Sequence, residues 1–593
     1  MQLRTAELGA VVATLIVGVL VGAGGAAAAK APRFTNTPLL RPEGGTEPAL
    51  AIAADGTMAV TALNISFPLE FSYTNLWKGQ FGTTPLFQGP VDERIEGSYG
   101  GADADVDLGS TGTLHASTLV ASFNATLSRD QLGISSIACP NANTSDHFAH
   151  CTSQLIDTTT ADRPFITSDG PTVYVDYHDA GNSGAIRVQR SDDDGASWKR
   201  VGDATMGLGQ VTSGATFNND VGPIVADART HAVYVLFSSG SASNKSKDFT
   251  HNKLYVASSS DLGQHWTANL VYQAPAGTSF GNPFPGGLAL DPLTGAVHVA
   301  VSDGRTAYFF SSTDGARTWS PPSFLNVAPV RSALFPNVAA YGGTVDVSYY
   351  GTPASDHNDP NAVWNVYLAK STDGGAHFAQ TAVTATPNRV GPVCVEGSAC
   401  FGGYRTLAEV QEVAIDPQSR RAAIAYATDT IGDPIRIVAG PNKGTYPSAE
   451  GAFTRSLLTL PGAVMTGATT YAGLACPGDT VPPPADDGDP TTPEIALIMR
   501  GSCLFADKAQ AALDAGYDGF IVFNYASGAH GGDEVFPMEA GVYRDIPAEM
   551  VGHSTGLKIA GVAGDADLRI GAPGAAISVG RLRVQAALAQ ETP

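Results

Sequence analysis

The sequence predicts a mainly β fold: a β-propeller of six or seven blades over residues 40–450, followed by a small C-terminal α/β unit over residues 455–590. Three observations predict it. The 593-residue chain contains 67 glycines and 38 prolines, which suits a fold built from many hairpin turns. One short motif recurs at the spacing of a four-stranded blade. After about residue 490 the pattern changes from hairpins to alternating strands and helices.

The recurring motif reads Ser-x-Asp-x-Gly-x-x-aromatic, and each copy follows an alternating apolar run that is typical of a strand. In such a turn the Ser and Asp side chains bond backbone N–H groups, the Gly takes a positive φ, and the aromatic side chain packs beneath. We refer to the four copies as Asp boxes and expect them to be structural. Their defining residues are Ser191, Asp193, Gly195 and Trp198; Ser259, Asp261, Gly263 and Trp266; Ser312, Asp314 and Trp319, with Ala316 at the glycine position; and Ser371, Asp373, Gly375 and Phe378.

Strand pairs without a box occur at three more places, near residues 48–60, 103–117 and 412–425. Counting them with the four boxed segments gives seven candidate blades. Six blades remain the alternative if the first pair only closes the ring.

Residues 40–450 resemble the sialidase-like (BNR or Asp-box repeat) superfamily of β-propellers. That superfamily includes sialidases, other glycosidases and non-catalytic modules, so the resemblance implies a fold more than a function. A sialidase clamps a sugar carboxylate with three arginines, and it uses an Asp as acid/base and a Tyr activated by a Glu as nucleophile. The Phe/Tyr-Arg-Ile-Pro motif that should stand near the start of such a propeller is absent here.

Several residues could still supply this chemistry. The clamp candidates begin predicted innermost strands and are Arg163, Arg331 and Arg405. Asp103, Asp105 and Asp107 alternate along one strand, which predicts a shared face; Asp105 is the acid/base candidate, and Tyr404 with Glu409 is the nucleophile pair. The alternative is that all of these charges only line a polar central channel. The aspartates are not an EF-hand loop, because Leu108 occupies the required glycine position.

The C-terminal unit resembles a protease-associated (PA) domain. The similarity rests on residues 495–505 with Lys508, on residues 515–524, and on Ile546-Pro547-Ala548. Met499 stands where an Asp is common, and Glu549 interrupts an apolar strand. PA domains are non-catalytic lids or docking modules, so the resemblance implies that role here.

One segment of this unit, Gly552-His553-Ser554-Thr555-Gly556, fits the nucleophile elbow G-x-S-x-G. An α/β-hydrolase would need an Asp and then a His downstream, and His553 is the last histidine in the chain. We therefore expect Ser554 or Thr555 to cap a helix.

Export is predicted by residues 1–29, in which Arg4, an apolar run and a small-residue stretch follow in the order of a signal peptide. The alternative is an uncleaved membrane anchor; with cleavage, no membrane insertion is expected and the protein is secreted or at the cell surface. Disulfides suit this location, and the closest cysteine pairs are Cys139 with Cys151, Cys394 with Cys400, and Cys476 with Cys503.

The remaining expectations concern partners. A formal charge of −22 disfavours nucleic acid, and no cofactor motif or metal-ligand pattern is present. We expect a protein that recognises a glycan or an extracellular protein. The alternative is an exo-acting glycoside hydrolase of sialidase type.

Overall fold

The computed structural model describes residues 31–593 except 43, 65–72, 92–97, 123–130, 143–150, 159–160, 180–184, 209–218, 241–250, 281–285, 396–406, 408–409, 431–433, 486–490, 529, 539, 541 and 581–582. The predicted signal peptide, residues 1–29, lies outside the described part. Among the described residues, no helix is long and apolar enough to cross a membrane.

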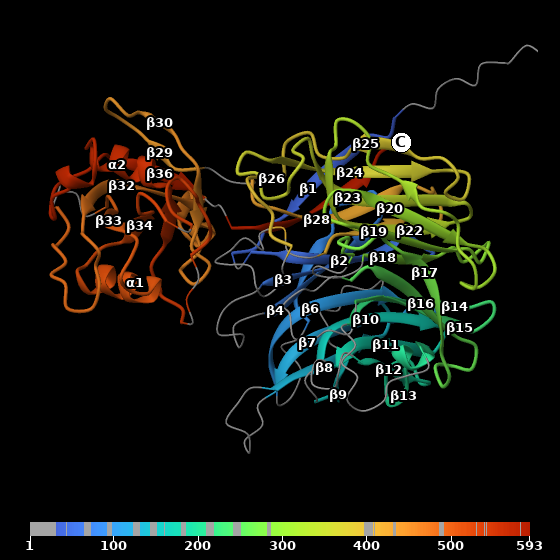
Figure 1. Cartoon of the computed structure of the whole chain (residues 1–593). Helices are drawn as coiled ribbons and strands as arrows, with labels where there is room; N and C mark the ends of the chain where they lie inside the picture. Colours follow the sequence, from blue (N-terminus) through green and yellow to red (C-terminus); the bar gives the residue numbers. More distant parts are fainter. Residues whose placement is uncertain are drawn as a thin grey trace, which may run out of the picture. The chain divides into compact units, whose positions relative to one another are not determined.

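The propeller has seven blades, each an antiparallel sheet, among the residues that the structure describes (Figure 1). Blade 1 contains β2 (Thr46–Ile52), β3 (Thr57–Asn64), β4 (Tyr73–Gln80) and β5 (Leu86–Pro90). Blade 2 contains β6 (Ser98–Leu108), β7 (Leu114–Ser122), β8 (Gln131–Cys139) and β9 (Thr152–Asp157). Blade 3 contains β10 (Ala161–Asp169), β11 (Thr172–Asp179), β12 (Ala185–Ser191) and β13 (Lys199–Asp203).

Three further blades follow in the same order along the chain. Blade 4 contains β14 (Asn219–Asp227), β15 (Ala232–Ser239), β16 (Lys253–Ser259) and β17 (Thr267–Gln273). Blade 5 contains β18 (Gly287–Leu290), β19 (Val297–Ser302), β20 (Ala307–Ser312) and β21 (Ser323–Phe324). Blade 6 contains β22 (Ser332–Tyr341), β23 (Thr344–Thr352), β24 (Val363–Ser371), β25 (Ala379–Ala382) and the additional short strand β26 (Arg389–Val390).

Blade 7 closes the ring with strands from both ends of the described chain. Its order is β1 (Phe34–Leu39), β37 (Gln585–Glu591), β28 (Ala422–Thr428) and β27 (Glu412–Ile415). The prediction of either six or seven blades is therefore settled at seven.

The strand β37 also corrects the predicted boundaries, because it belongs to the propeller although it falls inside residues 455–590. It pairs with β28 through Ala425 opposite Leu588 and with β1 through Thr37 opposite Leu588. The α/β unit is thus inserted between the second and third strands of blade 7. Such a pairing joins segments far apart in sequence, so no local pattern indicates it.

The Asp boxes form the expected turns between the third and fourth strands of blades 3 to 6. In the second box, the Ser259 hydroxyl donates to Asp261 Oδ1 (2.9 Å), Gly263 N donates to Ser259 Oγ (3.0 Å), and Trp266 Nε1 donates to Gly263 O (2.8 Å). The glycine φ is +85° there. In the third box Ala316 adopts the same left-handed region at φ +62°. The structural interpretation of the boxes therefore agrees with their hydrogen bonds.

The inserted unit is an α/β domain built on one mixed sheet with the order β30-β29-β36-β32-β33-β34-β35-β31. Its strands are β29 (Arg436–Ile437), β30 (Gly444–Thr445), β31 (Ser448–Glu450), β32 (Val464–Tyr471), β33 (Glu494–Met499), β34 (Gly519–Phe523), β35 (Ala548–Val551) and β36 (Ile577–Gly580). Helix α1 (Phe505–Asp514) packs with one apolar core of this domain and α2 (His553–Ala560) with the other. Short 3₁₀ helices cover Ala204–Leu208 in the propeller and Leu457–Thr459, Pro461–Ala463 and Asp565–Asp567 in this domain.

Two of the predicted disulfides are present: Cys139 with Cys151, and Cys476 with Cys503. The third prediction, Cys394 with Cys400, involves Cys400, which lies outside the described residues.

Candidate functional site

Repeated β-bulges bring selected side chains of the propeller to its central cavity. The innermost strand is the first in the chain in blades 1 to 6 and β27 in blade 7. The pairing register shifts in β2, β6, β10, β14 and β22. In four of these five strands the bulge contains an X-Pro pair: Glu47-Pro48, Arg163-Pro164, Gly222-Pro223 and Phe335-Pro336. Proline has no N–H for the ladder, so it is tolerated on an edge strand or at a bulge. The pair therefore marks the same position in each blade.

The residues at these bulges have an unusual backbone. Glu47, Asp103, Arg163 and Phe335 have φ of +46°, +40°, +53° and +50°. Non-glycine residues rarely take positive φ, and such strain is concentrated at functional sites. Three of these four residues line one cavity.

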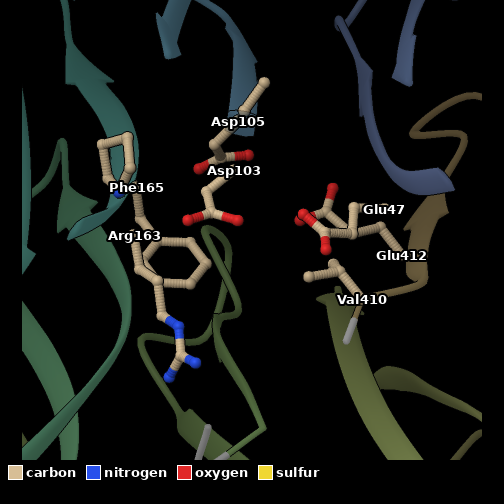
Figure 2. Close-up of a pocket in the computed structure, with 9 residues that line it drawn as sticks. Glu47, Asp103, Asp105, Arg163, Phe165, Val410 and Glu412 are labelled. Atoms are coloured by element: carbon tan, nitrogen blue, oxygen red, sulfur yellow. The ribbon is translucent and has the colours of Figure 1, made fainter. Parts of the chain in front are cut away.

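That cavity lies where the innermost strands of blades 1, 2, 3 and 7 converge (Figure 2). It contains about 380 Å³ of space, including the part open to solvent. Its lining residues are Glu47, Asp103, Ala104, Asp105, Arg163, Pro164, Phe165, Val410 and Glu412. Figure 2 shows the carboxylate of Asp103 pointing across the cavity toward those of Glu47 and Glu412. Four acidic side chains thus share this small space.

Backbone N–H groups hold two of the carboxylates in place. Leu50 N donates to Glu412 Oε2 (2.6 Å), Ile166 N donates to Asp105 Oδ2 (2.9 Å), and Val106 N donates to Asp105 Oδ1 (2.8 Å). Burial raises the pKa of Asp105 to about 7 despite these bonds. Burial also raises the pKa of Glu412 well above its usual value, and the nearby Asp105 adds to the rise. Asp105 can therefore hold or release a proton near neutral pH, and burial favours the protonated form of Glu412.

Among the described lining residues, Arg163 is the one basic side chain, and it is bound by a carboxylate of the next blade. Its Nη1 donates to Asp220 Oδ1 on β14 (2.8 Å). Figure 2 shows its guanidinium turned away from the acidic side chains. The cavity is therefore acidic in character.

The structure brings together two of the predicted site residues, Asp105 and Arg163. Arg331 is exposed and does not line the cavity. In blade 6 the bulge residue that corresponds to Arg163 of blade 3 is Phe335. Arg331 lies four residues before it and so outside the bulge. Tyr404, Arg405 and Glu409 lie outside the described residues.

The predicted shared face of Asp103, Asp105 and Asp107 holds for Asp105 and Asp107, whose pairing with β7 is regular, but a bulge separates Asp103 from them. The register of β6 shifts on both sides of Ala102, and Asp103 lies in the bulge. Asp103 and Asp105 line the cavity, whereas Asp107 accepts a hydrogen bond from Ser168 of blade 3. The bulge breaks the simple alternation on which the prediction rested.

Glu47, Phe165 and Glu412 were not predicted as site residues. The repeated X-Pro pair was a usable signal for Glu47, because it aligns Glu47 with Arg163 in the blade repeat. Glu412 has no such signal: its position depends on the closure of the ring beside blade 1.

The G-x-S-x-G segment has a structural explanation. Ser554 lies in the first turn of α2, where its N–H and hydroxyl donate to Asp533 Oδ1 (2.7 Å) and Oδ2 (2.8 Å). His553 Nε2 instead lies 2.7 Å from Asp565 Oδ1. The helix is thus capped by Asp533 and begins after Gly552, rather than being capped by Ser554 or Thr555.

No group of three or more His, Cys, Asp or Glu side chains among the described residues is arranged to hold a metal ion.

Comparison with known proteins identifies the inserted domain. Residues 463–559 match the family model of the PA domain. The chain is similar to E3 ubiquitin-protein ligase RNF133 of Rattus norvegicus, with 39% identity over 67 residues (11% of this chain and 17% of that protein). It is also similar to RING finger protein 148 of Bos taurus, with 38% identity over 69 residues (12% and 22%). The chain spans about a fifth of the length of these relatives.

The solved structures that resemble the chain do so at low identity. A Hadza microbial sialidase, Hz136, is 13% identical, with 63% of this chain and 73% of that chain covered and a TM-score of 0.36. A polysaccharide lyase, the PL25 ulvan lyase, is 12% identical, with 66% and 91% covered and a TM-score of 0.39. A Dyadobacter fermentans protein of unknown function is 13% identical, with 67% and 95% covered and a TM-score of 0.37.

The seven sheets and their Asp boxes define a β-propeller that carries an inserted α/β domain. That inserted domain is a PA domain. Both expected folds are confirmed.

Proposed function

We propose that this protein is an extracellular recognition protein whose central propeller cavity binds an uncharged part of a glycan. The observation that carries the proposal is the lining of the cavity, in which four carboxylates accompany one arginine that Asp220 already binds. Carboxylate oxygens accept hydrogen bonds from sugar hydroxyls, and such charge-assisted bonds are strong. Phe165 adds an apolar surface. An acidic sugar would bring a further negative charge into the cavity, which Coulomb repulsion opposes.

The extracellular location is supported by the signal-peptide pattern of residues 1–29 and by the two disulfides, which persist in oxidising compartments. We assign the PA domain the non-catalytic role of its family, as a docking or covering module. Ligands of the whole protein are therefore glycans, with an extracellular protein as the partner of the PA domain.

A second function, an exo-acting glycoside hydrolase, is favoured by a specific observation. Asp103 faces Glu47 and Glu412 across the cavity (Figure 2), and burial raises the pKa of Asp105 to about 7. Glycoside hydrolysis uses two carboxyl groups on either side of the scissile bond, one of them protonated. The acidic lining favours uncharged substrates for this activity as well.

A glycan array followed by titration calorimetry tests the proposal. We expect the secreted protein to bind neutral glycans, with a loss of about tenfold or more in affinity in Asp103→Asn, the size of one charge-assisted hydrogen bond. Arg331→Ala is the matched control and should bind as the native protein does. Sialoside binding that disappears in Arg331→Ala would contradict the proposal.

A panel of fluorogenic glycosides separates the two functions. Binding without turnover supports recognition alone. Turnover of a neutral glycoside that is lost in Asp105→Asn would establish the hydrolase. Turnover of a sialoside, lost in Arg163→Ala and Arg331→Ala, would establish the sialidase-type chemistry instead.

A further inference from the structure

Ionisable side chains continue from the cavity into the interface between blades 2 and 3. Asp105 lines the cavity, and Asp107 is two residues further along β6. The cross-strand partner of Asp107 on β7 is His115. His115 Nε2 lies 3.1 Å from Oδ1 of Asp194, in the first Asp box of blade 3. Directly opposed residues of an antiparallel pair lie close enough to interact, so these four groups form a continuous series.

Blade 3 fixes both aspartates from the other side. Ile166 N donates to Asp105 Oδ2 (2.9 Å), and the hydroxyl of Ser168 donates to Asp107 Oδ2. Ile166 and Ser168 are two residues apart on β10, as Asp105 and Asp107 are on β6. The spacing of the two strands therefore holds the carboxylates at a constant separation, which for such neighbours on one face is roughly 7 Å.

His115 has one bonded and one unbonded ring nitrogen. The hydroxyls of Thr111 and Thr113 both donate to Asp194 (3.0 and 2.5 Å), so this carboxylate acts as an acceptor and Nε2 of His115 carries the hydrogen. The His115 side chain is fully buried, whereas 32% of the Asp194 side chain is exposed. No described polar group forms a hydrogen bond with Nδ1 of His115. Nδ1 is therefore a buried lone pair that can accept a proton.

The carboxylate that orients His115 distinguishes one Asp box from the other three. Asp194 occupies the position before the turn residue of the motif (Gly195 in this box), where the other boxes have Leu262, Gly315 and Gly374. Its φ is +58°, a left-handed conformation that Asp tolerates better than most residues. Among the four boxes, the first alone supplies an acid at this point.

We propose that His115, oriented by Asp194, is a positioning residue whose protonation is coupled electrostatically to that of its cross-strand partner Asp107, and that this coupling sets the charge of Asp105 in the central cavity. When the proton is on His115, the imidazolium stabilises the negative Asp107, and the negative Asp107 opposes ionisation of Asp105. When the proton is on Asp107, that opposition is absent and Asp105 ionises more readily. As far as it concerns ligand binding, this inference rests on the proposed function of the cavity.

The electrostatic environment agrees with such coupling. Burial raises the pKa of Asp107 and lowers the pKa of His115, while the attraction between the two groups opposes both effects. The neighbouring Asp107 adds to the rise in the pKa of Asp105. The other titratable or charged groups facing Asp105 are Asp103 on β6, Arg163 on β10, Asp176 on β11, Glu47 on β2 and Glu412 on β27.

The test measures the titration of Asp105 without any ligand. The unfolding midpoint of Asp105→Asn minus that of the native protein is followed from pH 4 to pH 8.5. Because the pKa of Asp105 is raised to about 7 in the folded state, the native protein loses stability relative to Asp105→Asn as the pH rises from about 4, and the difference levels near pH 7. The same difference is then measured in four other backgrounds, one of them a control.

In the Asp107→Asn and His115→Gln backgrounds we expect the difference to level about one pH unit lower, from the Coulomb energy of two carboxylates roughly 7–10 Å apart at an effective dielectric constant of about 20. Asp194→Asn should shift this levelling pH in the same direction by a smaller amount. Because Asp194 is partly exposed, this variant should fold even if the variants at the buried residues do not. Asp192→Asn in the same box is the control and should produce no shift. If the stability difference follows the same pH curve in the native, His115→Gln and Asp194→Asn backgrounds, the proposal is overturned. This result does not depend on whether the glycan array detects binding.

Discussion

Replacing Glu549 with glutamine should stabilise the PA domain at neutral pH. Glu549 lies on β35, opposite Glu450 of β31. Its side chain is fully buried, and among the described residues only the nearby Ser448 hydroxyl and the Arg583 guanidinium favour its ionised form. Burial raises the pKa of Glu549 well above its usual value, and Glu450 adds to the rise. The folded domain therefore binds this proton more tightly than the unfolded chain does.

The size and pH dependence of the effect follow from this proton. Glutamine places a polar group of the same shape at this position but does not ionise, so the gain is the free energy of ionisation alone, about 1–3 kcal/mol for a pKa rise of one to two pH units. Because the pKa of Glu549 is raised on folding, the stability that Glu549 contributes to the folded domain is complete below the pKa of the unfolded chain. That stability is lost as the pH rises toward the pKa of the folded domain. The loss is about 1.4 kcal/mol per pH unit within that window. The advantage of Glu549→Gln should thus be small at pH 4 and large at pH 7.

Hydrogen exchange in the peptides that contain β34 and β35 measures this stability locally. We expect protection in Glu549→Gln to rise about 5- to 150-fold at pH 7, which corresponds to 1–3 kcal/mol. Glu450→Gln is the matched control with the opposite sign. Glu450 accepts hydrogen bonds from Leu457 N (2.9 Å) and Arg583 N (3.2 Å) and pairs with the Arg583 guanidinium, so its loss leaves a buried cation uncompensated. Lower protection in Glu549→Gln at pH 7, or a gain that does not change with pH, would refute the reasoning.

Two further predictions concern the Asp boxes and a disulfide. Ala316→Gly should stabilise the propeller by up to about 1 kcal/mol and raise its melting temperature, because glycine relieves the φ of +62°. Gly375→Ala should lower the melting temperature, since a Cβ there would lie 2.5 Å from the Phe309 ring. Melting temperatures that shift in the same direction in both variants would contradict this. Cys476→Ser with Cys503→Ser opens a loop with a sequence separation of 27 and should cost about 3–4 kcal/mol. Calorimetry should then show a PA transition at lower temperature with the propeller transition unchanged.

The features that the sequence predicted correctly are local ones. An Asp box is held by hydrogen bonds within five residues, such as Gly263 N to Ser259 Oγ, so its pattern is readable in a short window. The blades are hairpins joined by turns for the same reason, and the PA domain shows its own alternation of strand and helix.

The cavity was less predictable because it depends on bulges and on ring closure. Asp105 and Arg163 were identified from their strands, but the bulge that turns Asp103 into the cavity interrupts the alternation on which such reasoning relies. Whether Arg331 reaches the cavity likewise depends on the position of the bulge at Phe335 along the innermost strand of blade 6. Glu412 reaches the cavity only because blade 7 closes against blade 1, where Leu50 N binds it.

The closure of blade 7 has a consequence for the order in which the molecule is made. Strands β27 and β28 are synthesised before the whole PA domain, whereas their partner β37 follows it. Six blades and three of the four strands of the seventh must therefore persist with an open seam while residues 429–584 emerge from the ribosome. Domains fold as units during synthesis, so a PA domain that folds promptly brings the two sides of the seam within reach. Substitutions that slow its folding should expose the unpaired edge of β28 to other chains, and aggregation of the propeller would then originate in a domain outside it.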